Sequence, residues 1–343
     1  MPLDLAEARS LFPPVRGYLD SATYGLPPQT TWDAVQLALD QWRTGTGDWI
    51  EWQESVGEAR AIWAGLVGVP VERVAVGATV SELAGLVAAS IAAPARVVAA
   101  DVEFASLLFP FLLQHDVRTV PLARLADAVD AATDVVAVSA VQSSTGEVAD
   151  LDAIEEAARE RDALVIVDAT HAVGWLPIDA SRYDAVACAG YKWLLSPRGT
   201  AYLALGERLI DRVRPLHANW FAGEDPHTSY YGPPLRLASS ARRFDTSPAW
   251  FSWNGAAPAV RVLADVGIET IHRHNVGLAN RFREGLGLAP SNSAIVSANI
   301  TDAEGKLARA NIRAASRGGS LRAAFHLYTT EADVDAAVEA LQG

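Results

Sequence analysis

The chain has 343 residues, half of them hydrophobic, which is enough apolar material for one large and one small domain. Its formal net charge of −13 argues against a basic nucleic-acid-binding surface and against attraction to anionic membranes. Its single cysteine, Cys188, excludes an intrachain disulfide, and no segment has the pattern of a signal peptide or a membrane span, so we expect a cytoplasmic protein without membrane, nucleic-acid or metal partners.

Short apolar runs alternate with helical patterns through the first two thirds of the chain. The runs are rich in Val, Ala, Leu and Ile without alternation, which is typical of strands covered on both faces. The pattern predicts an α/β fold with a mostly parallel sheet. The predicted strands are residues 73–76, 96–100, 118–120, 134–141, 164–168, 185–189 and 200–205, and the predicted helices are residues 31–43, 55–67, 81–92, 104–115 and 152–161.

The last third of the chain begins with an irregular segment, residues 217–253, which is rich in Pro, Gly, Ser and aromatic residues. So long a segment without periodicity is usually functional. A helix-rich stretch at 255–286, two strand-like runs at 294–300 and 320–327 and a final helix at 331–341 follow. We predict an N-terminal segment (1–20) that packs on the small domain, a large domain (21–250) and a small C-terminal domain (251–343).

Two neighbouring strands end at a lysine and an aspartate. The apolar run 185–189 leads to Lys192, and the run 163–167 stops at Asp168. Ligands of open α/β sheets bind beyond the carboxyl ends of the strands. A lysine that binds an aldehyde covalently, beside a carboxylate that keeps a pyridine nitrogen protonated, suits pyridoxal 5'-phosphate. The alternative is an ordinary solvated lysine at a strand end. The presence of His171, and of Ser143 after a third strand, favours the interpretation as a cofactor site.

Residues 77–82, Gly-Ala-Thr-Val-Ser-Glu, join the first strand to a helix. The small residues around Ala78 let the backbone approach an anion, and Thr79 and Ser81 add hydroxyl groups at the helix N-terminus. This is a candidate phosphate site. The alternative is an ordinary helix cap, and the residues alone leave the two interpretations evenly matched.

Six motifs stand in the order seen in class V aminotransferases, which the chain resembles over nearly its whole length. This fold-type-I pyridoxal phosphate group includes cysteine desulfurases, kynureninase and isopenicillin N epimerase. The resemblance implies a three-layer α/β/α large domain, a smaller C-terminal α/β domain and a homodimer with shared active sites. The motifs are YLDSATYGLP (18–27), GATVSE (77–82), DATH (168–171), AGYK (189–192), PRG (197–199) and LRAAFHLY (321–328).

The resemblance implies a role for each matching residue. Lys192 would bind the cofactor covalently, and Asp168 would pair with its ring nitrogen. Arg322 would clamp the substrate carboxylate through two parallel hydrogen bonds, which suits a guanidinium group. The other implied cofactor contacts are His171 and Ser143 near the ring hydroxyl, and Ala78, Thr79, Tyr191 and the partner subunit's Thr246 near the phosphate.

Three positions depart from the family pattern. Phe104 stands where many members place a histidine over the cofactor ring; it can stack there but cannot move protons. Ser143 replaces the usual asparagine, and the neighbouring Gln142 could make that contact instead. The histidine that often precedes the lysine is Tyr191.

Large aromatic residues crowd two parts of the chain that show no clear periodicity. Three tryptophans fall within residues 41–52, and many more aromatic residues lie within 217–253. One interpretation is packing at a dimer interface, where aromatic residues are enriched. The other is a cage for a quaternary ammonium group. The predicted substrate contacts besides Arg322 are Tyr24, Trp49 and Trp52.

Residues 20–27, 47–52, 141–147 and 322–331 further resemble the C–S lyase subgroup of ergothioneine biosynthesis. That resemblance implies β-elimination from hercynylcysteine sulfoxide, a sulfur-containing amino acid with a trimethylammonium group, with release of pyruvate and ammonia. The alternatives are a cysteine desulfurase, an aminotransferase or epimerase acting on another amino acid, and a non-catalytic dimeric scaffold. A desulfurase needs an exposed thiol far downstream of the lysine, whereas Cys188 precedes Lys192 within a predicted strand.

Overall fold

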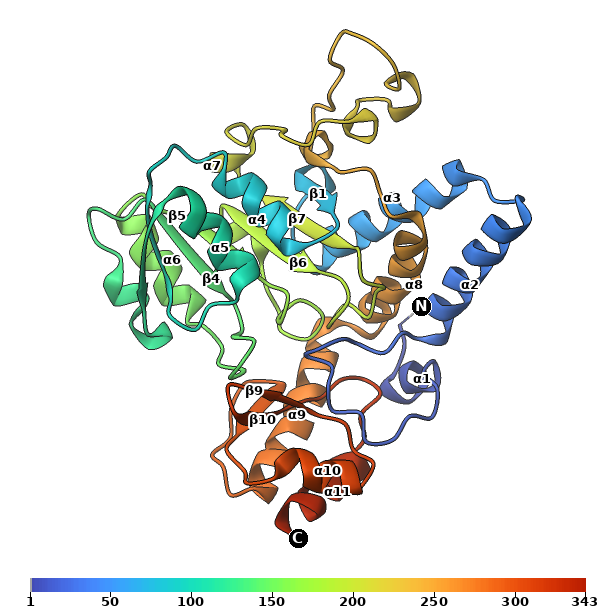
Figure 1. The fold of residues 1–343 in the computed structure, drawn as a ribbon, viewed down its shortest axis with the longest axis vertical. Helices are drawn as coiled ribbons and strands as arrows, with labels where there is room; N and C mark the ends of the chain where they lie inside the picture. The colour runs from blue at the N-terminus through green and yellow to red at the C-terminus, as the bar shows by residue number, and fades with distance from the viewer. Residues whose placement is uncertain (1) are drawn as a thin grey trace.

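The chain folds around a seven-stranded sheet and a separate three-stranded sheet near the C-terminus (Figure 1). The computed structural model describes residues 2–343. The large sheet has the order β1-β7-β6-β5-β4-β2-β3, and β7 runs antiparallel to both of its neighbours while the other pairs are parallel. Its strands are β1 (Val74–Gly77), β2 (Arg96–Ala100), β3 (Asp116–Val120), β4 (Val135–Ser139), β5 (Leu164–Asp168), β6 (Ala185–Ala189) and β7 (Ala201–Leu205).

Helices cover both faces of this sheet, which confirms the predicted three-layer fold. Along β5, Leu164 and Ile166 join the apolar cluster under α4 and α5, whereas Val165 and Val167 join the cluster under α3, α6 and α8. A strand that is buried on both faces carries apolar side chains on both, which explains the continuous apolar runs in the sequence. The helices of this unit are α2 (Gln29–Thr44), α3 (Trp49–Leu66), α4 (Val80–Ala88), α5 (Ala105–Gln114), α6 (Leu151–Glu160), α7 (Glu207–Ile210) and α8 (Trp250–Val266).

Two helices, α3 and α8, begin six and five residues earlier than predicted. The helix expected at 55–67 begins at Trp49, where the Asp48 side chain caps it by accepting a hydrogen bond from the Ile50 N–H. The segment expected to be irregular as far as residue 253 becomes α8 at Trp250. The view that the aromatic residues lie in irregular chain was therefore wrong at the starts of α3 and α8, whereas residues 217–249 contain no α-helix or strand. Large apolar residues stand at neighbouring positions in both first turns, so the helical period of apolar residues is hidden there.

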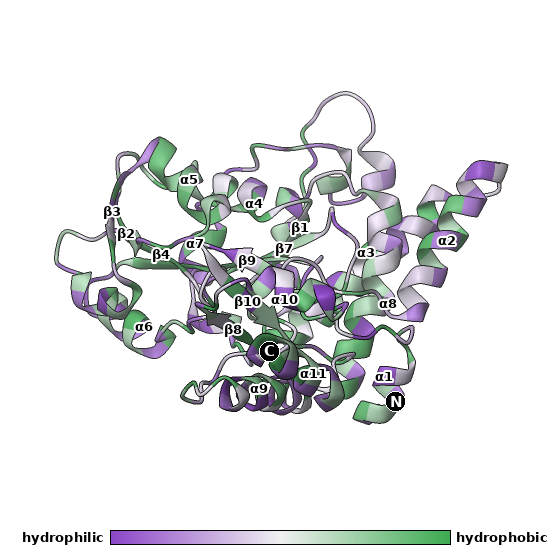
Figure 2. Cartoon of the chain, turned by 60° about the horizontal axis from the view of Figure 1, so that its bottom comes forward, coloured by the Kyte–Doolittle hydropathy of each residue, from purple (hydrophilic) through white to green (hydrophobic). Residues whose placement is uncertain are grey.

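The smaller unit carries the antiparallel sheet β8-β10-β9, and α9 and α11 pack against each other beside it (Figure 1). In Figure 2 the helices α9, α10 and α11 mix hydrophobic and hydrophilic residues, and their buried hydrophobic residues pack with those of β8 and β10. The N-terminal segment, which begins with α1 (Leu5–Ser10), reaches this unit through bridges from Tyr18 to Arg313 and from Asp20 to Ala324. The elements are α9 (Ile268–Gly285), β8 (Ile295–Ala298), α10 (Ala303–Arg309), β9 (Ala315–Arg317), β10 (Ser320–Ala324) and α11 (Glu331–Gln342).

The boundaries at residues 20 and 250 stay a prediction, and α8, which follows the second boundary, packs against α2 and α3 of the large unit. Within residues 2–343, no helix is both long and apolar enough to cross a membrane. Over the same range, no group of three or more His, Cys, Asp or Glu residues is arranged to hold a metal ion.

A buried ion pair joins α3 to the segment that precedes α8. The Arg60 guanidinium donates from Nη1 to Oδ1 of Asp245 at 3.0 Å and from Nη2 to Oδ2 at 2.6 Å. Asp245 Oδ1 also accepts from the Val76 N–H at 2.8 Å, at the end of β1. Burial raises the pKa of the Asp245 carboxyl, and Arg60 opposes that rise. The pair therefore holds the backbone at Thr246 against β1, where the Thr246 N–H donates to the Val76 carbonyl.

Arg60→Met is expected to lower the free energy of unfolding by about 3–5 kcal/mol, because it leaves the Asp245 carboxylate buried without its cation. The matched control is Arg261→Met, which breaks a half-exposed ion pair with Glu58 and should cost less than about 1 kcal/mol. Urea denaturation of the three proteins under the same conditions measures both effects. An Arg60→Met loss no greater than that of the control would contradict the role of the pair.

Candidate active site

A cleft opens at the carboxyl ends of β4, β5 and β6, and the first turns of α4 and α5 form its other side. It contains about 610 Å³ of empty space, part of it open to solvent. The predicted residues that line it are Ala78, Thr79, Phe104, Asp168, His171, Tyr191 and Lys192.

Asp168 and Lys192 both line the cleft: Asp168 is the last residue of β5, and Lys192 lies on the loop that follows the adjacent parallel strand β6. Each is only 5% exposed. Burial lowers the pKa of the Lys192 ammonium to about 8, although the nearby Asp168 carboxylate opposes this shift. Burial raises the pKa of Asp168, whereas hydrogen bonds from Thr170 and the charge of Lys192 lower it. Lys192 therefore has a larger neutral, nucleophilic fraction than an exposed lysine.

His171 contacts Lys192 and Trp193 through its two ring nitrogens. Its Nε2 lies 2.7 Å from Lys192 Nζ, and its Nδ1 accepts a hydrogen bond from the Trp193 indole N–H at 3.3 Å. Burial, followed by the charges of Lys192 and Arg322, holds the pKa of His171 well below its usual value. The imidazole is therefore neutral at physiological pH.

Two aromatic rings flank the lysine. Lys192 Nζ lies 5.4 Å from the centroid of the Phe104 ring and 5.6 Å from that of the Tyr191 ring. Phe104 is 45% exposed and immediately precedes α5, so its ring is available at the mouth of the cleft. The Arg198 guanidinium lies 5.1 Å from the centroid of the Tyr191 ring and also lines the cleft. Arg198 was not among the residues predicted from the sequence, although it stands within the PRG motif.

The helix-cap interpretation of residues 77–82 is confirmed, and the phosphate interpretation stays a prediction. Thr79 is the N-cap of α4 and accepts a hydrogen bond from the Glu82 N–H at 3.2 Å, as an ordinary cap does. Its hydroxyl also lies 3.2 Å from that of Ser81, and both residues line the cleft. The Ala78 N–H donates to the Glu82 carboxylate at 2.8 Å. The hydroxyl pair at this helix N-terminus, with Arg198 on the other side, suits a phosphate group.

Gln142 and Ser143 lie behind the cleft rather than in its lining. Gln142 is fully buried; its Nε2 donates to Glu103 at 3.2 Å, and its Oε1 has no hydrogen-bond partner among the described residues. Glu103, which was not predicted from the sequence, also accepts from the N–H and hydroxyl of Ser139 and from the Phe104 N–H. Burial raises the pKa of Glu103, and these hydrogen bonds oppose that. Glu103 thus ties Phe104 to the end of β4.

Arg322, on β10 of the smaller unit, is not among the residues that line the cleft. Its Nη1 donates to the Ser143 carbonyl at 2.6 Å, and its Nη2 donates to the Thr23 hydroxyl at 2.8 Å. Its Nη2 lies 3.9 Å from Asp20 Oδ1, and burial lowers the pKa of the guanidinium to about 10. Arg322 is 2% exposed. Through these contacts it connects β10 to the N-terminal segment and to the loop that follows β4.

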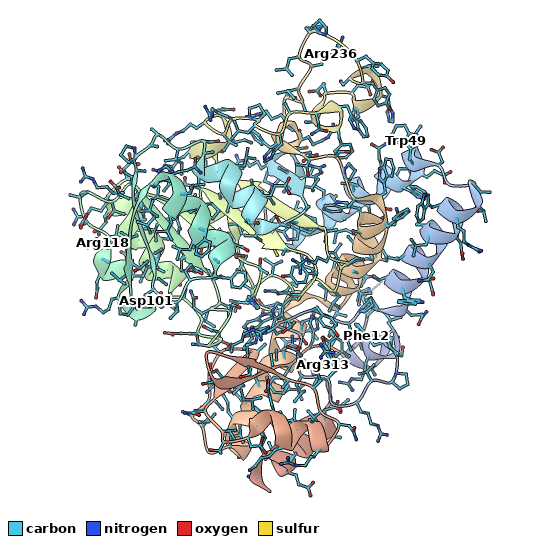
Figure 3. All side chains as sticks on the ribbon, viewed as in Figure 1. Phe12, Trp49, Asp101, Arg118, Arg236 and Arg313 are labelled. Atoms are coloured by element: carbon cyan, nitrogen blue, oxygen red, sulfur yellow. The ribbon has the colours of Figure 1, made fainter. Side chains whose placement is uncertain are left out.

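The remaining predicted residues lie outside the cleft of this chain. Tyr24 packs near Arg313, and the Thr246 backbone meets β1. Trp49 and Trp52 lie on the first turn of α3, and Figure 3 shows Trp49 far from Phe12 and Arg313. Trp52 is 7% exposed and its indole N–H donates to Gln41, so within one chain it serves packing.

The cleft fits pyridoxal phosphate. An aldehyde needs a nucleophilic amine, which the buried Lys192 provides, and a pyridine nitrogen needs a carboxylate, which Asp168 presents at the adjacent strand end. The phosphate needs hydrogen-bond donors and positive charge, which Thr79, Ser81 and Arg198 supply.

The fold and the cleft define a pyridoxal phosphate enzyme of fold type I. The chain belongs to the aminotransferase class-V family, whose model matches residues 109–307. It is 28% identical to an uncharacterized aminotransferase of Bacillus subtilis (strain 168), over 96% of this chain and 95% of that protein. The family predicted from the motifs is therefore confirmed.

Two solved structures illustrate the fold. The apo cysteine desulfurase from Thermococcus onnurineus NA1 has a TM-score of 0.85 and 20% identity, covering 98% of each chain. The cystine C–S lyase C-DES, in complex with cysteine persulfide, has a TM-score of 0.83 and 20% identity, covering 95% of this chain and 97% of that one. At this level of identity the likeness establishes the fold, and the reaction has to be argued from the site.

Proposed function

We propose that the protein is a pyridoxal phosphate-dependent C–S β-lyase that cleaves hercynylcysteine sulfoxide. The observation that carries the choice of substrate is a group of aromatic rings around Trp49. The Trp49 ring centroid lies 5.7 Å from that of Trp220, 6.0 Å from Trp250, 5.8 Å from His227 and 6.2 Å from Tyr230. At this spacing the rings pack directly against one another, so a quaternary ammonium group would bind on the outer faces of this packed group.

The two aromatic groups of the sequence thus meet in space. One comes from the start of α3, and the other comes from the segment that leads into α8 and from the first turn of α8 itself. We call these five residues, Trp49, Trp220, His227, Tyr230 and Trp250, the aromatic group. Tyr230 is 38% exposed, so the aromatic group reaches the surface.

The aromatic group lies outside the cleft of its own chain, so we propose that it completes the cleft of a second copy in a homodimer. The family resemblance places the partner subunit's Thr246 at the cofactor phosphate, and Trp250 follows Thr246 by four residues, at the start of α8. A segment that delivers Thr246 to the partner would bring Trp250 and its neighbours close to the same cleft. The substrate would then bind between the lysine of one subunit and the rings of the other.

The residues of the cleft suit α-proton removal. Pyridoxal phosphate, when bound, supplies an electron sink for the negative charge that develops at the substrate α-carbon. Asp168 holds a proton on the ring nitrogen, and Lys192 Nζ accepts the α-proton. The Arg322 guanidinium, which is already desolvated by burial, binds the substrate carboxylate. Phe104 covers the cleft and limits the access of water.

Proton removal at the α-carbon allows the Cβ–S bond to break. The sulfur leaves with the bonding electrons as a sulfenate, and the three-carbon fragment reacts with water to give pyruvate and ammonia. No external oxidant or reductant is needed for this step. A desulfurase would need an exposed thiol to accept sulfur. Cys188 does not provide one, because it is fully buried in β6 and burial raises the pKa of its thiol.

The test is pyruvate release from hercynylcysteine sulfoxide, from its counterpart with an unmethylated histidine, and from a plain cysteine sulfoxide. A cage worth about 2 kcal/mol would favour the trimethylated substrate by roughly thirtyfold in kcat/KM. Trp49→Ala should remove most of this preference while leaving cleavage of the plain sulfoxide intact. Trp42→Ala is the matched control, because Trp42 is 65% exposed and contacts Phe251 rather than the rings of the aromatic group. Equal kcat/KM values for the three substrates would refute the cage.

Arg322→Lys is expected to raise KM by roughly tenfold or more, although the charge is kept. A lysine ammonium is a point charge and cannot replace a planar group that donates to Ser143, Thr23 and a carboxylate at once. Saturation curves with the same sulfoxide measure the effect, and Arg317→Lys is the control on the neighbouring strand β9. An unchanged KM in Arg322→Lys would place the carboxylate clamp elsewhere.

A further inference from the structure

The Trp193 indole is fixed in place directly after Lys192. It is fully buried, and its ring lies 5.6 Å from the Trp175 ring and is stacked at 5.5 Å on the His326 ring. The backbone is fixed as well: a Cβ at Gly174 would lie 2.3 Å from the Trp193 carbonyl oxygen, so only glycine permits this close approach. Trp193 therefore has little freedom to rotate away from its hydrogen-bond partner.

That partner is His171 Nδ1, which accepts the Trp193 indole N–H at 3.3 Å. An indole nitrogen can only donate, so Nδ1 of His171 must offer its lone pair. Because burial keeps the imidazole neutral, the ring carries one proton, and that proton must then reside on Nε2. The indole thus selects one of the two tautomers of His171.

The tautomer matters because His171 Nε2 lies 2.7 Å from Lys192 Nζ. A neutral imidazole has one acceptor nitrogen, and the Trp193 indole and a charged Lys192 ammonium would both need it. The indole cannot lose its proton, whereas the lysine can. With the proton on Nε2, the contact is satisfied when His171 donates and a neutral Lys192 amine accepts.

We propose that Trp193 is a positioning residue that holds the His171 proton on Nε2 and thereby favours the neutral, nucleophilic form of Lys192. The other ionisable groups that act on Lys192 are Asp168, which favours the charged amine, Cys188, which acts in the same sense, and Arg322 and Arg317, which disfavour it. Trp193 acts through His171 in addition to these charges and to burial. The proposal concerns the preparation of the lysine and holds whichever substrate is used.

The chain offers a matched pair of variants. Trp193→Phe keeps an aromatic ring and removes the indole N–H that meets the His171 ring. Trp175→Phe is an equally buried change that removes an indole N–H donated to the backbone carbonyl of the same histidine at 2.7 Å. A role in packing alone would make the two variants alike, whereas a role in selecting the tautomer affects only the first.

The first readout is the ¹⁵N NMR spectrum of the full-length protein labelled in histidine, with cofactor bound and after its removal. The His171 signals are assigned by their loss in His171→Gln. The wild-type protein and Trp175→Phe should show a protonated Nε2 and an unprotonated Nδ1, and Trp193→Phe should show a shift toward the other tautomer or a mixture. A wild-type spectrum with the proton on Nδ1 would overturn the proposal, even if Trp193→Phe failed to fold.

The second readout is the rate at which cofactor-free protein binds pyridoxal 5'-phosphate covalently as a function of pH, followed by absorbance. This rate depends on the neutral fraction of Lys192. In Trp193→Phe its midpoint should rise by about one pH unit, so that the rate near pH 7 falls about tenfold. Trp175→Phe should leave the midpoint within about 0.3 pH units of wild type. Equal midpoints in wild type and Trp193→Phe, or equal shifts in both variants, would overturn the proposal.

Discussion

Lys192→Ala is expected to abolish covalent cofactor binding and to lower turnover to below a few per cent of wild type. The buried amine serves both as the attachment point and as the base, and loss of proton transfer alone removes roughly 10²–10⁴-fold in rate. The neutral fraction of this amine grows as the pH rises through its pKa of about 8, so covalent binding by the wild type should accelerate over the same range. The measurements are pyruvate release and the protein mass after borohydride reduction.

The chain supplies its own control, because its only other lysine is Lys306. Lys306 lies on α10 of the smaller unit and donates to the Leu341 carbonyl, remote from the cleft lining. Lys306→Ala should retain cofactor attachment and activity, and the reduced mass should map to the peptide that contains Lys192. Attachment and turnover that survive in Lys192→Ala would show that Lys192 is not the residue that binds the cofactor.

Asp168→Asn is expected to retain the cofactor but to slow α-proton removal by roughly 10²–10³-fold. The neutral amide keeps the shape of the side chain and can still accept from the Thr170 N–H at Oδ1, but it no longer stabilises a protonated ring nitrogen. The exchange of the substrate α-proton with deuterated solvent measures that step directly.

The control for this substitution is Asp184→Asn. Asp184 is another mostly buried aspartate with a pKa raised by burial, but its carboxylate meets the Val165 N–H and Arg208 at the opposite end of the strands. Asp184→Asn should leave proton exchange close to wild type. Near-normal exchange in Asp168→Asn would mean that another group pairs with the ring nitrogen.

The sequence predicts the large sheet well, because strands buried on both faces leave a clear signal in the form of continuous apolar runs. Of the predicted strands, 96–100, 164–168 and 185–189 coincide with β2, β5 and β6. The positions of Lys192 and Asp168 follow from that signal, since adjacent strand ends bring their side chains to one edge of the sheet. In the smaller unit the sequence signal is weaker. Strand β9 has only three residues, and α10 is short and contains Gly305, a residue type that disfavours helix formation.

Contacts between distant segments could not be predicted in the same way. The ion pair of Arg60 with Asp245, the hydrogen bond of Trp193 to His171 and the group that Glu103 makes with Ser139 and Gln142 all depend on how helices and loops pack onto the sheet. Arg322 was assigned by resemblance, and its contacts with Ser143 and Thr23 depend on where the smaller unit lies. The sequence contains one local indication that Glu103 belongs to the site, namely its position directly before the unusual Phe104.

The products formed from hercynylcysteine sulfoxide by the cofactor-loaded protein test the β-lyase reaction most directly. That reaction predicts one pyruvate and one ammonia for each Cβ–S bond broken, and neither product in Lys192→Ala. Alanine together with protein-bound sulfur would instead indicate a desulfurase. Recovery of a keto acid or of the opposite enantiomer with the C–S bond intact would indicate transamination or epimerisation, and any of these results would contradict a β-lyase.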